Sequence, residues 1–137
     1  MRKLLTWGAL PLMVLTAPGA IAPAAAGDPD ARVISEGFRY LPGDDAFPVP
    51  TLSVPEGGSL EYTNLERFLF PTPHSVTDAR CYDDPSIPAC EPRFDSGLIS
   101  SPVTVDVAGV SALDPGAYPF YCTLHPEMRG TLVVQGA

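Results

Sequence analysis

A cysteine, a histidine and a methionine recur at three-residue intervals near the end of the chain, in the stretch YCTLHPEMRG. They are Cys122, His125 and Met128, which offer a thiolate, an imidazole and a thioether within one short loop. The only other histidine, His74, lies far upstream in the stretch PTPHSV. Two histidines, one cysteine and a weakly bound axial methionine are the ligands of copper sites that transfer electrons. These four residues are therefore our candidate metal ligands.

Zinc is the main alternative metal for this set of ligands. Zinc favours four strong nitrogen, sulfur or oxygen donors, and the neutral thioether of Met128 is a poor fourth donor. Copper alternates between a state that prefers imidazole and a state that prefers soft sulfur, so a mixed set suits both states. We therefore expect one copper ion per chain. Four ligands leave no position open for a substrate, and no histidine remains for a second copper centre, which argues against an enzyme.

The first 26 residues have the order of a secretory signal peptide: a short basic start, an apolar run, and small residues that offer A-x-A cleavage signals. A membrane anchor is the alternative, but the apolar run is too short to span a bilayer and contains Pro11. We expect cleavage after Ala26, with a site after Ala22 as the alternative. Residues 27–137 then form one exported domain, periplasmic or extracellular.

The three cysteines of an exported chain are an odd number, which leaves one of them without an intramolecular partner. Cys81 and Cys90 bracket the stretch YDDPSIPA, and an oxidising compartment would join them. Such a bridge closes a small loop and contributes about 2–3 kcal/mol to stability. Cys122 is then the free thiol that a metal site requires.

The formal net charge is −8 at pH 7. An acidic domain of this kind is not expected to bind nucleic acid or an anionic membrane surface by electrostatic attraction. The acidity favours solubility and, in a complex, a basic partner.

The chain after residue 26 has the pattern of short strands. Seventeen prolines and twelve glycines over the full length punctuate short apolar and β-branched runs, without a long 3.6-residue period. Turn signals lie at PEGG and DPG. We therefore expect an all-β fold of two packed sheets. The candidate strands are 33–40, 51–54, 59–63, 75–77, 103–107, 117–122 and 131–135. The longest irregular stretch, 78–98, is too long to be an idle connection.

These stretches together resemble the cupredoxins, and most closely their amicyanin, pseudoazurin and plastocyanin branch. The resemblance covers essentially all of residues 27–137, including FRYLP, LSVPEGGSLEYTN, PHSV, FDSGLI and GAYPFYCTLHPEMRGTLVV. The spacing of Cys122, His125 and Met128, with a proline directly after the histidine, is similar to that of amicyanin. Plastocyanin-type loops place the methionine farther on. The extended loop at 78–98 departs from the family pattern.

The resemblance implies a Greek-key β-sandwich of about seven to eight strands with copper at one end. It also implies which residues surround the ligands. The Ser75 N–H would donate to the Cys122 sulfur, and Thr123 and Asn64 would tie the two ligand segments together. Asn64 is equally well explained as a turn residue. Leu124, at a position where amicyanin has a proline, keeps an N–H that can reach the Cys122 sulfur.

The function implied is that of a one-electron carrier outside the cytoplasm, whose partners are redox proteins. The exposed edge of His125 would accept the electron. An apolar contact patch is expected around this edge, formed by Pro126 and by the segment 69–73. A copper storage or delivery protein outside the cytoplasm is the alternative. We expect a monomer that is not inserted in a membrane.

Overall fold

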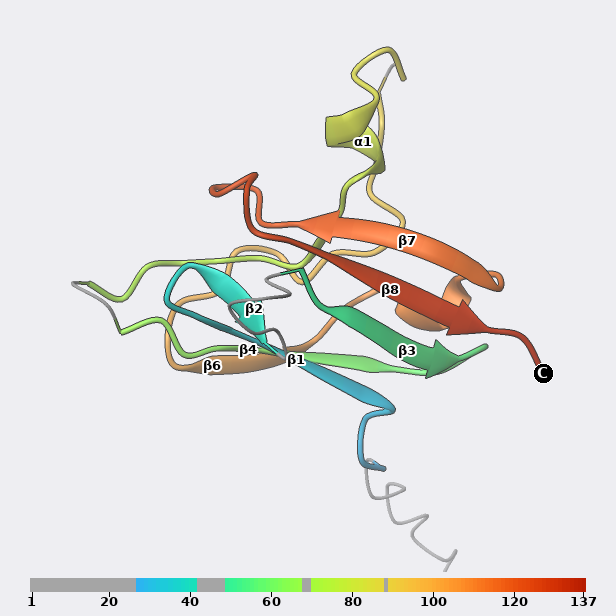
Figure 1. Cartoon of the computed structure of the whole chain (residues 1–137), viewed down its shortest axis with the longest axis horizontal. Helices are drawn as coiled ribbons and strands as arrows, with labels where there is room; N and C mark the ends of the chain where they lie inside the picture. Colours follow the sequence, from blue (N-terminus) through green and yellow to red (C-terminus); the bar gives the residue numbers. More distant parts are fainter. Residues whose placement is uncertain (1–26, 42–48, 68–69, 88) are drawn as a thin grey trace, which may run out of the picture.

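The computed structural model describes residues 27–41, 49–67, 70–87 and 89–137. In this part of the chain, eight strands form two four-stranded sheets that lie one over the other (Figure 1). This arrangement confirms the expected all-β sandwich. The proposed leader, residues 1–26, lies outside the described residues, so the expected cleavage and export stay predictions.

The first sheet has the strand order β2-β1-β4-β6, and β1 runs parallel to β4 while the other pairs are antiparallel. Its strands are β1 (Ala31–Glu36), β2 (Arg39–Leu41), β4 (Leu60–Asn64) and β6 (Val103–Asp106). The second sheet has the order β3-β8-β7-β5, and here β3 runs parallel to β8. Its strands are β3 (Thr51–Pro55), β5 (Thr77–Asp78), β7 (Gly116–Tyr121) and β8 (Arg129–Gln135).

The core lies between the sheets, and buried side chains alternate with more exposed ones along the strands that enclose it. In β4, Leu60, Tyr62 and Asn64 are buried while the residues between them are partly exposed. β8 alternates in the same way. Because successive side chains of a strand point to opposite faces, each sheet supplies one apolar face. The largest buried apolar side chains are Tyr40, Tyr62, Phe94, Phe120, Leu60 and Leu132.

Two predicted strands were placed wrongly. The segment 33–40 is two strands, because the chain reverses at Gly37 and Phe38, which both have positive φ, 62° and 56°. A two-residue turn with φ > 0 at both positions matches the right-handed twist of the flanking strands. The predicted strand 75–77 begins at Thr77 instead, and His74 forms an isolated bridge with Ile99.

The long irregular stretch contains a short helix, α1 (Arg80–Asp83), and a 3-10 helix, η1 (Val110–Ala112), follows β6. Figure 1 shows α1 projecting beyond β7, and the turn between β7 and β8 at the end of the sandwich away from the C terminus. None of the helices in the described ranges is long and apolar enough to cross a membrane.

Candidate metal centre

Three of the predicted ligand atoms meet at one place. His74 Nδ1 and His125 Nδ1 are 3.1 Å apart, and each lies 3.6 Å from Cys122 Sγ. A point about 2 Å from all three atoms lies inside this triangle, and that distance is typical of bonds from nitrogen to metals such as zinc. The thiol of Cys122 is buried and is not part of a disulfide. The three side chains therefore fit a single metal ion.

The loop from Cys122 to Met128 is held by hydrogen bonds within itself. The N–H of His125 donates to the Cys122 carbonyl (3.1 Å), and the N–H of Met128 donates to the His125 carbonyl (2.8 Å). The Cys122 N–H donates to the Met128 carbonyl (3.1 Å), which closes the loop between β7 and β8. Met128 is 2 % exposed. All three predicted ligands of this loop are thus fixed by backbone hydrogen bonds, and the Met128 side chain is buried.

His74 comes from a different part of the chain and is fixed by pairing with Ile99. The two residues exchange backbone hydrogen bonds of 3.2 and 2.9 Å. The buried Asn64 side chain donates to the carbonyls of Ile99 and Thr72, both at 2.9 Å, and accepts a bond from the N–H of Glu66. Asn64 therefore joins the segment before His74 to the segment that pairs with it.

The environment of His74 favours a neutral imidazole. Burial lowers the pKa of His74, and the neighbouring His125 lowers it further, while the carboxylate of Glu66 acts in the opposite direction. A metal ligand must be deprotonated to bind. The lowered pKa therefore keeps the His74 imidazole uncharged at neutral pH, so that its Nδ1 is available to a metal.

Glu66 and Phe38 are parts of the site that the sequence did not indicate. Glu66 Oε2 lies 3.6 Å from His74 Nε2 and accepts a hydrogen bond of 2.9 Å from the Phe38 N–H. The Phe38 ring meets the His74 ring edge-on at 5.5 Å and the His125 ring edge-on at 5.1 Å. A buried acid in a predicted loop and a phenylalanine in a predicted strand carry no local signal of such a role.

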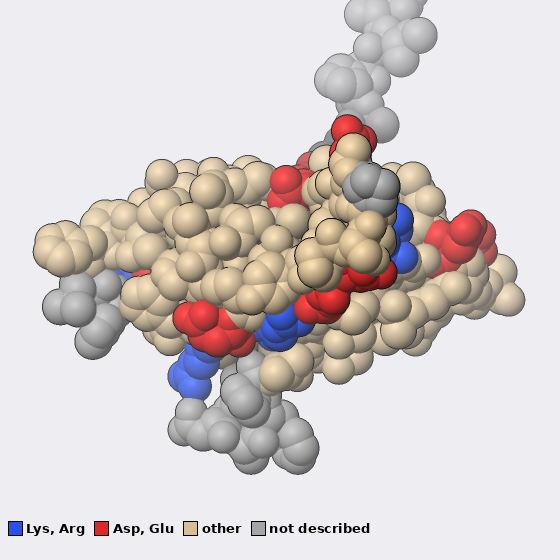
Figure 2. Space-filling view, turned by 90° about the horizontal axis from the view of Figure 1, so that it is seen from above, with Lys and Arg blue, Asp and Glu red and all other residues tan. Residues whose placement is uncertain are grey.

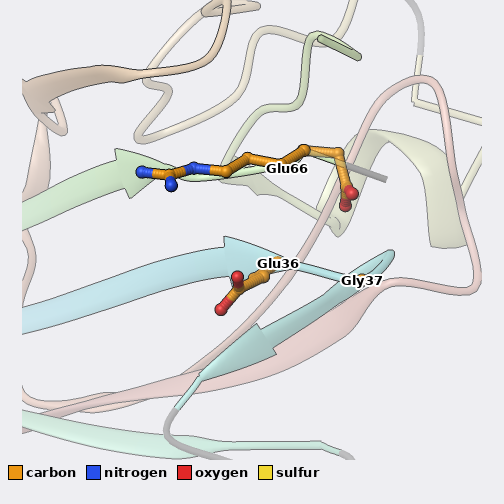
Figure 3. A pocket seen from close by; sticks show the side chains of 4 residues that line it. Glu36, Gly37 and Glu66 are labelled. Carbon is orange, nitrogen blue, oxygen red and sulfur yellow. The ribbon is translucent and has the colours of Figure 1, made fainter. Parts of the chain in front are cut away.

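A shallow pocket of about 300 Å³ opens beside this group and is lined by Glu36, Gly37, Glu66 and Arg67. Figure 3 shows Glu36 and Gly37, at the end of β1 and in the turn that follows it, facing the segment that carries Glu66. Phe38 has the left-handed conformation, which is uncommon for a bulky residue and is found where surrounding contacts fix it. Its ring contacts with two imidazoles and its bond to Glu66 are such contacts.

The side chains of Ser75 and Thr123 join the two ligand segments directly. The Thr123 N–H donates to Ser75 Oγ at 3.0 Å, and the two hydroxyls are 3.2 Å apart. In the described residues neither the Ser75 N–H nor the Leu124 N–H forms a hydrogen bond with the Cys122 sulfur. Those two bonds were expected for the copper-loaded site, and they stay predictions.

The site approaches the surface at His125. His125 and Pro126 are partly exposed. Leu124, the residue before His125, is 50 % exposed, and Phe38, whose ring contacts both histidines, is 39 % exposed. In the segment 69–73, Phe70 is 76 % exposed, and residue 69 lies outside the described part of the chain.

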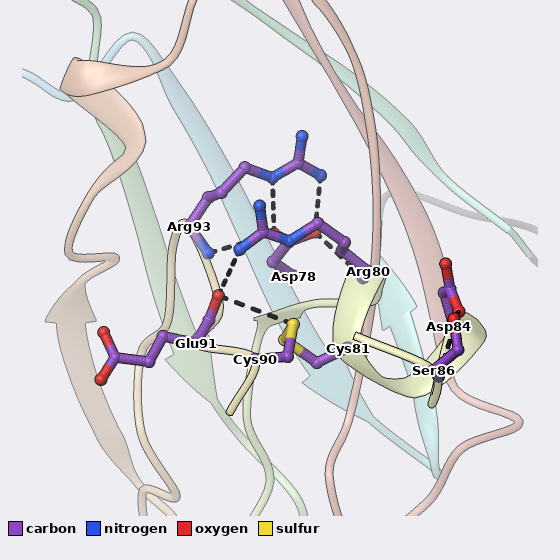
Figure 4. The surroundings of a disulfide bond; sticks show 8 residues. All are labelled: Asp78, Arg80, Cys81, Asp84, Ser86, Cys90, Glu91 and Arg93. Carbon is purple, nitrogen blue, oxygen red and sulfur yellow. Dashed lines mark hydrogen bonds and ion pairs between the residues drawn. A yellow bond between two sulfur atoms is a disulfide. The ribbon is translucent and has the colours of Figure 1, made fainter. Parts of the chain in front are cut away.

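The predicted disulfide between Cys81 and Cys90 is present in the structure, with Cα atoms 5.5 Å apart. Figure 4 shows it between α1 and the returning chain, next to Asp78 and Arg93. The buried Asp78 carboxylate accepts bonds from Arg93 Nε (2.7 Å), Nη2 (2.8 Å) and the backbone N–H (3.0 Å). Burial raises the pKa of Asp78, but the bonds from Arg93 and Arg80 outweigh it and lower the pKa overall.

Comparison with known structures defines the fold class. A reduced amicyanin variant matches with a TM-score of 0.53 and 20% identity over 82% of this chain and 88% of that one. The Cu(I) form of another amicyanin variant matches with a TM-score of 0.54 and 20% identity over 82% of this chain and 88% of that one. The purple cupredoxin from Nitrosopumilus maritimus gives 0.55 and 20% over 77% of this chain and 100% of that one. The chain therefore has a cupredoxin-like fold.

No protein-family model matches the sequence, and no curated protein matches it. The likeness therefore concerns the fold, and the chemistry of the site rests on its own residues. Two imidazoles and one thiol whose ligand atoms lie together, with a buried methionine on the same loop, are compatible with a copper site.

Proposed function

We propose that this chain is an exported blue copper protein that carries single electrons between redox proteins and is not an enzyme. The main support is the triangle of His74 Nδ1, Cys122 Sγ and His125 Nδ1, with Met128 buried on the same loop. When bound, copper supplies a one-electron couple between Cu(II) and Cu(I). Met128 is the proposed axial ligand.

The chain holds these ligands from two sides, which suits an electron carrier. His74 is fixed by its bridge to Ile99, and the loop from Cys122 to Met128 is closed by backbone hydrogen bonds. Ligands that are held by rigid elements keep one geometry. With four ligands at one ion, no coordination position remains for a substrate.

The proposed contact point for partners is the partly exposed edge of His125, with Pro126 and the exposed side chains of Leu124 and Phe38 around it. Weak redox encounters use small interfaces, so a patch of this kind is sufficient. Removal of residues 1–26 takes away Arg2 and Lys3 and no acid, so the net charge changes from −8 to −8 − 2 = −10. This charge favours basic partners through long-range attraction.

Export is part of this proposal. We propose that residues 1–26 are removed and that residues 27–137 form the working domain. The Cys81–Cys90 disulfide supports a location outside the cytoplasm, where oxidising conditions preserve such bonds.

The test is to purify residues 27–137, add one equivalent of Cu(II), and record the visible spectrum before and after repeated reduction and reoxidation. We expect an intense blue absorption that returns undiminished in each cycle. A protein without this absorption contradicts the copper assignment. A protein that becomes coloured but surrenders copper to an acceptor after one reduction is instead the storage or delivery protein.

A further inference from the structure

We propose that the disulfide-bridged segment 80–91, called the insert below, is a brace that holds the metal loop 122–128 in its binding conformation. Its purpose rests on the proposed copper function, but the mechanical contact does not. The insert lies within the loop 78–98, which departs from the family pattern, and it supplies none of the candidate metal ligands. Its contacts give it a role.

Arg129 is the link between the two segments. It directly follows Met128, and its Nε donates to the carbonyl of Pro126 at 2.9 Å, inside the metal loop. Its Nη1 donates to Asp83 Oδ1 of the insert at 3.0 Å. One planar guanidinium therefore holds both the backbone next to His125 and a carboxylate of the insert, which the fork geometry of arginine allows.

Tyr82 provides a second connection. Its ring lies under the Arg129 guanidinium, with the central carbon 5.2 Å from the ring centroid. The same ring lies 4.9 Å from the ring of Tyr121, the residue before Cys122. The insert thus contacts the chain on both sides of the metal loop, at Tyr121 and at Arg129.

The insert can act as a brace only if it is itself fixed. A helix of four residues has little stability of its own. The disulfide closes the insert, and the Ala79 N–H donates to the Pro119 carbonyl of β7 at 2.9 Å. Just outside the insert, Arg93 binds the buried Asp78 carboxylate through its Nε and Nη2 (Figure 4). The segment that carries Asp83 and Tyr82 is therefore fixed to the β-sandwich.

Charged side chains of both signs lie on the surface around the insert, as the Asp83–Arg129 ion pair requires. Figure 2 looks onto the face from which the insert projects, and acidic and arginine side chains lie side by side on it. The Asp83 and Arg129 side chains are 46% and 34% exposed. The pair is therefore partly screened by water, and each bond restrains the loop moderately.

The first experiment uses copper-free protein and measures amide hydrogen exchange by NMR. We expect Asp83→Ala to accelerate exchange at His125 and Met128, whose N–H groups bond within the loop, by about two- to fivefold. Exchange at Leu132, in the core, should stay unchanged and shows that the variant is folded. Asp83→Glu keeps the carboxylate, so exchange should stay slow. Arg129→Lys should accelerate exchange, because lysine lacks the fork of the guanidinium.

The matched control is Asp84→Ala. Asp84 is the next residue of the insert, carries the same charge, and bonds to Ser86 within its own turn. This substitution should leave exchange in the metal loop unchanged. An equal acceleration by Asp84→Ala, or no acceleration by Asp83→Ala, overturns the brace.

The second experiment uses copper-loaded protein and measures copper transfer to a chelator together with the visible spectrum. Asp83→Ala should release copper about two- to fivefold faster and broaden the absorption band, and Asp83→Glu should restore both. Wild-type protein that binds no copper contradicts the proposed function alone, because the exchange data still decide the brace. Unchanged release in Asp83→Ala contradicts the brace and leaves the copper function intact.

Discussion

The Glu66 carboxylate lies 3.6 Å from His74 Nε2, and neither side chain is accessible to solvent. Nε2 forms no hydrogen bond with the described residues, so this carboxylate is the charged group that faces it. Histidines that bind metals commonly direct their second N–H to a carboxylate, which fixes the tautomer. Glu66 therefore favours the tautomer with its proton on Nε2, and this tautomer leaves Nδ1 free to face Cys122 and His125.

Glu66→Gln is expected to weaken metal binding about tenfold, within the range found when partners of ligand histidines are replaced. An amide can turn its NH₂ toward Nε2, which stabilises the tautomer with the proton on the ligand nitrogen. Nitrogen-15 NMR of the copper-free protein gives the tautomer of His74, and metal titration gives the affinity. Glu36→Gln, an exposed acid beside the same pocket, is the control and should change neither. An unchanged His74 tautomer in Glu66→Gln contradicts this role.

Cys122→Ser is expected to abolish the blue absorption, because the thiolate is the ligand that gives the colour. The copper-free variant should stay folded, within about 1–3 kcal/mol of the wild type, since serine is similar in size but adds a buried hydroxyl. Visible spectroscopy with Cu(II) and chemical denaturation of the copper-free protein measure the two effects. If the variant keeps the band, Cys122 is not the ligand.

Met128→Gln is expected to leave a coloured site with a lower reduction potential. The axial ligand tunes the potential of such sites, and an amide oxygen stabilises Cu(II) more than a thioether does. Voltammetry of the two copper-loaded proteins measures the difference. A potential equal to that of the wild type means that Met128 is not the axial ligand.

The Asp78–Arg93 pair predicts a loss of stability in acid. Because the pKa of Asp78 is lower in the folded protein than the ordinary value of about 3.9, the unfolded chain binds the proton first as the pH falls. The stabilisation is complete above about pH 5, decreases as the pH falls through the unfolded value, and is lost below the folded pKa. Asp78→Asn should flatten this part of the curve in denaturation measured from pH 7 to pH 2. Asp106→Asn, at an exposed strand position, should not.

Gly130→Ala is expected to destabilise the fold by about 1–3 kcal/mol, the usual cost of overpacking. A Cβ at this position would lie 2.1 Å from Phe120 Cζ, and Phe120 is fully buried on the paired strand. Adding Phe120→Leu to Gly130→Ala should recover part of the loss, because the obstructing ring is removed. Chemical denaturation of both variants measures this, and a single variant as stable as the wild type contradicts the close contact.

Local features of the sequence were sufficient to predict the fold class, the disulfide and the metal loop. Apolar and polar residues alternate in the sequence at 60–63, and this alternation matches the burial along β4, since the side-chain period of a strand depends only on the backbone. Cys122, His125 and Met128 lie within seven residues, so their spacing alone places them in one loop. Cys81 and Cys90 are nine positions apart, which brings their sulfurs within reach of each other.

Residue types made His74 a candidate ligand together with Cys122, but the sequence could not show that the two side chains meet. His74 and Cys122 are 48 positions apart, and their approach depends on the packing of the two sheets. Two hydrogen bonds likewise join segments far apart in the chain. One runs from the Phe38 N–H to the Glu66 carboxylate, and the other from Arg129 to Asp83. Such contacts are set by strand register and sheet packing, which sum interactions over the whole core. No short stretch of sequence contains that information.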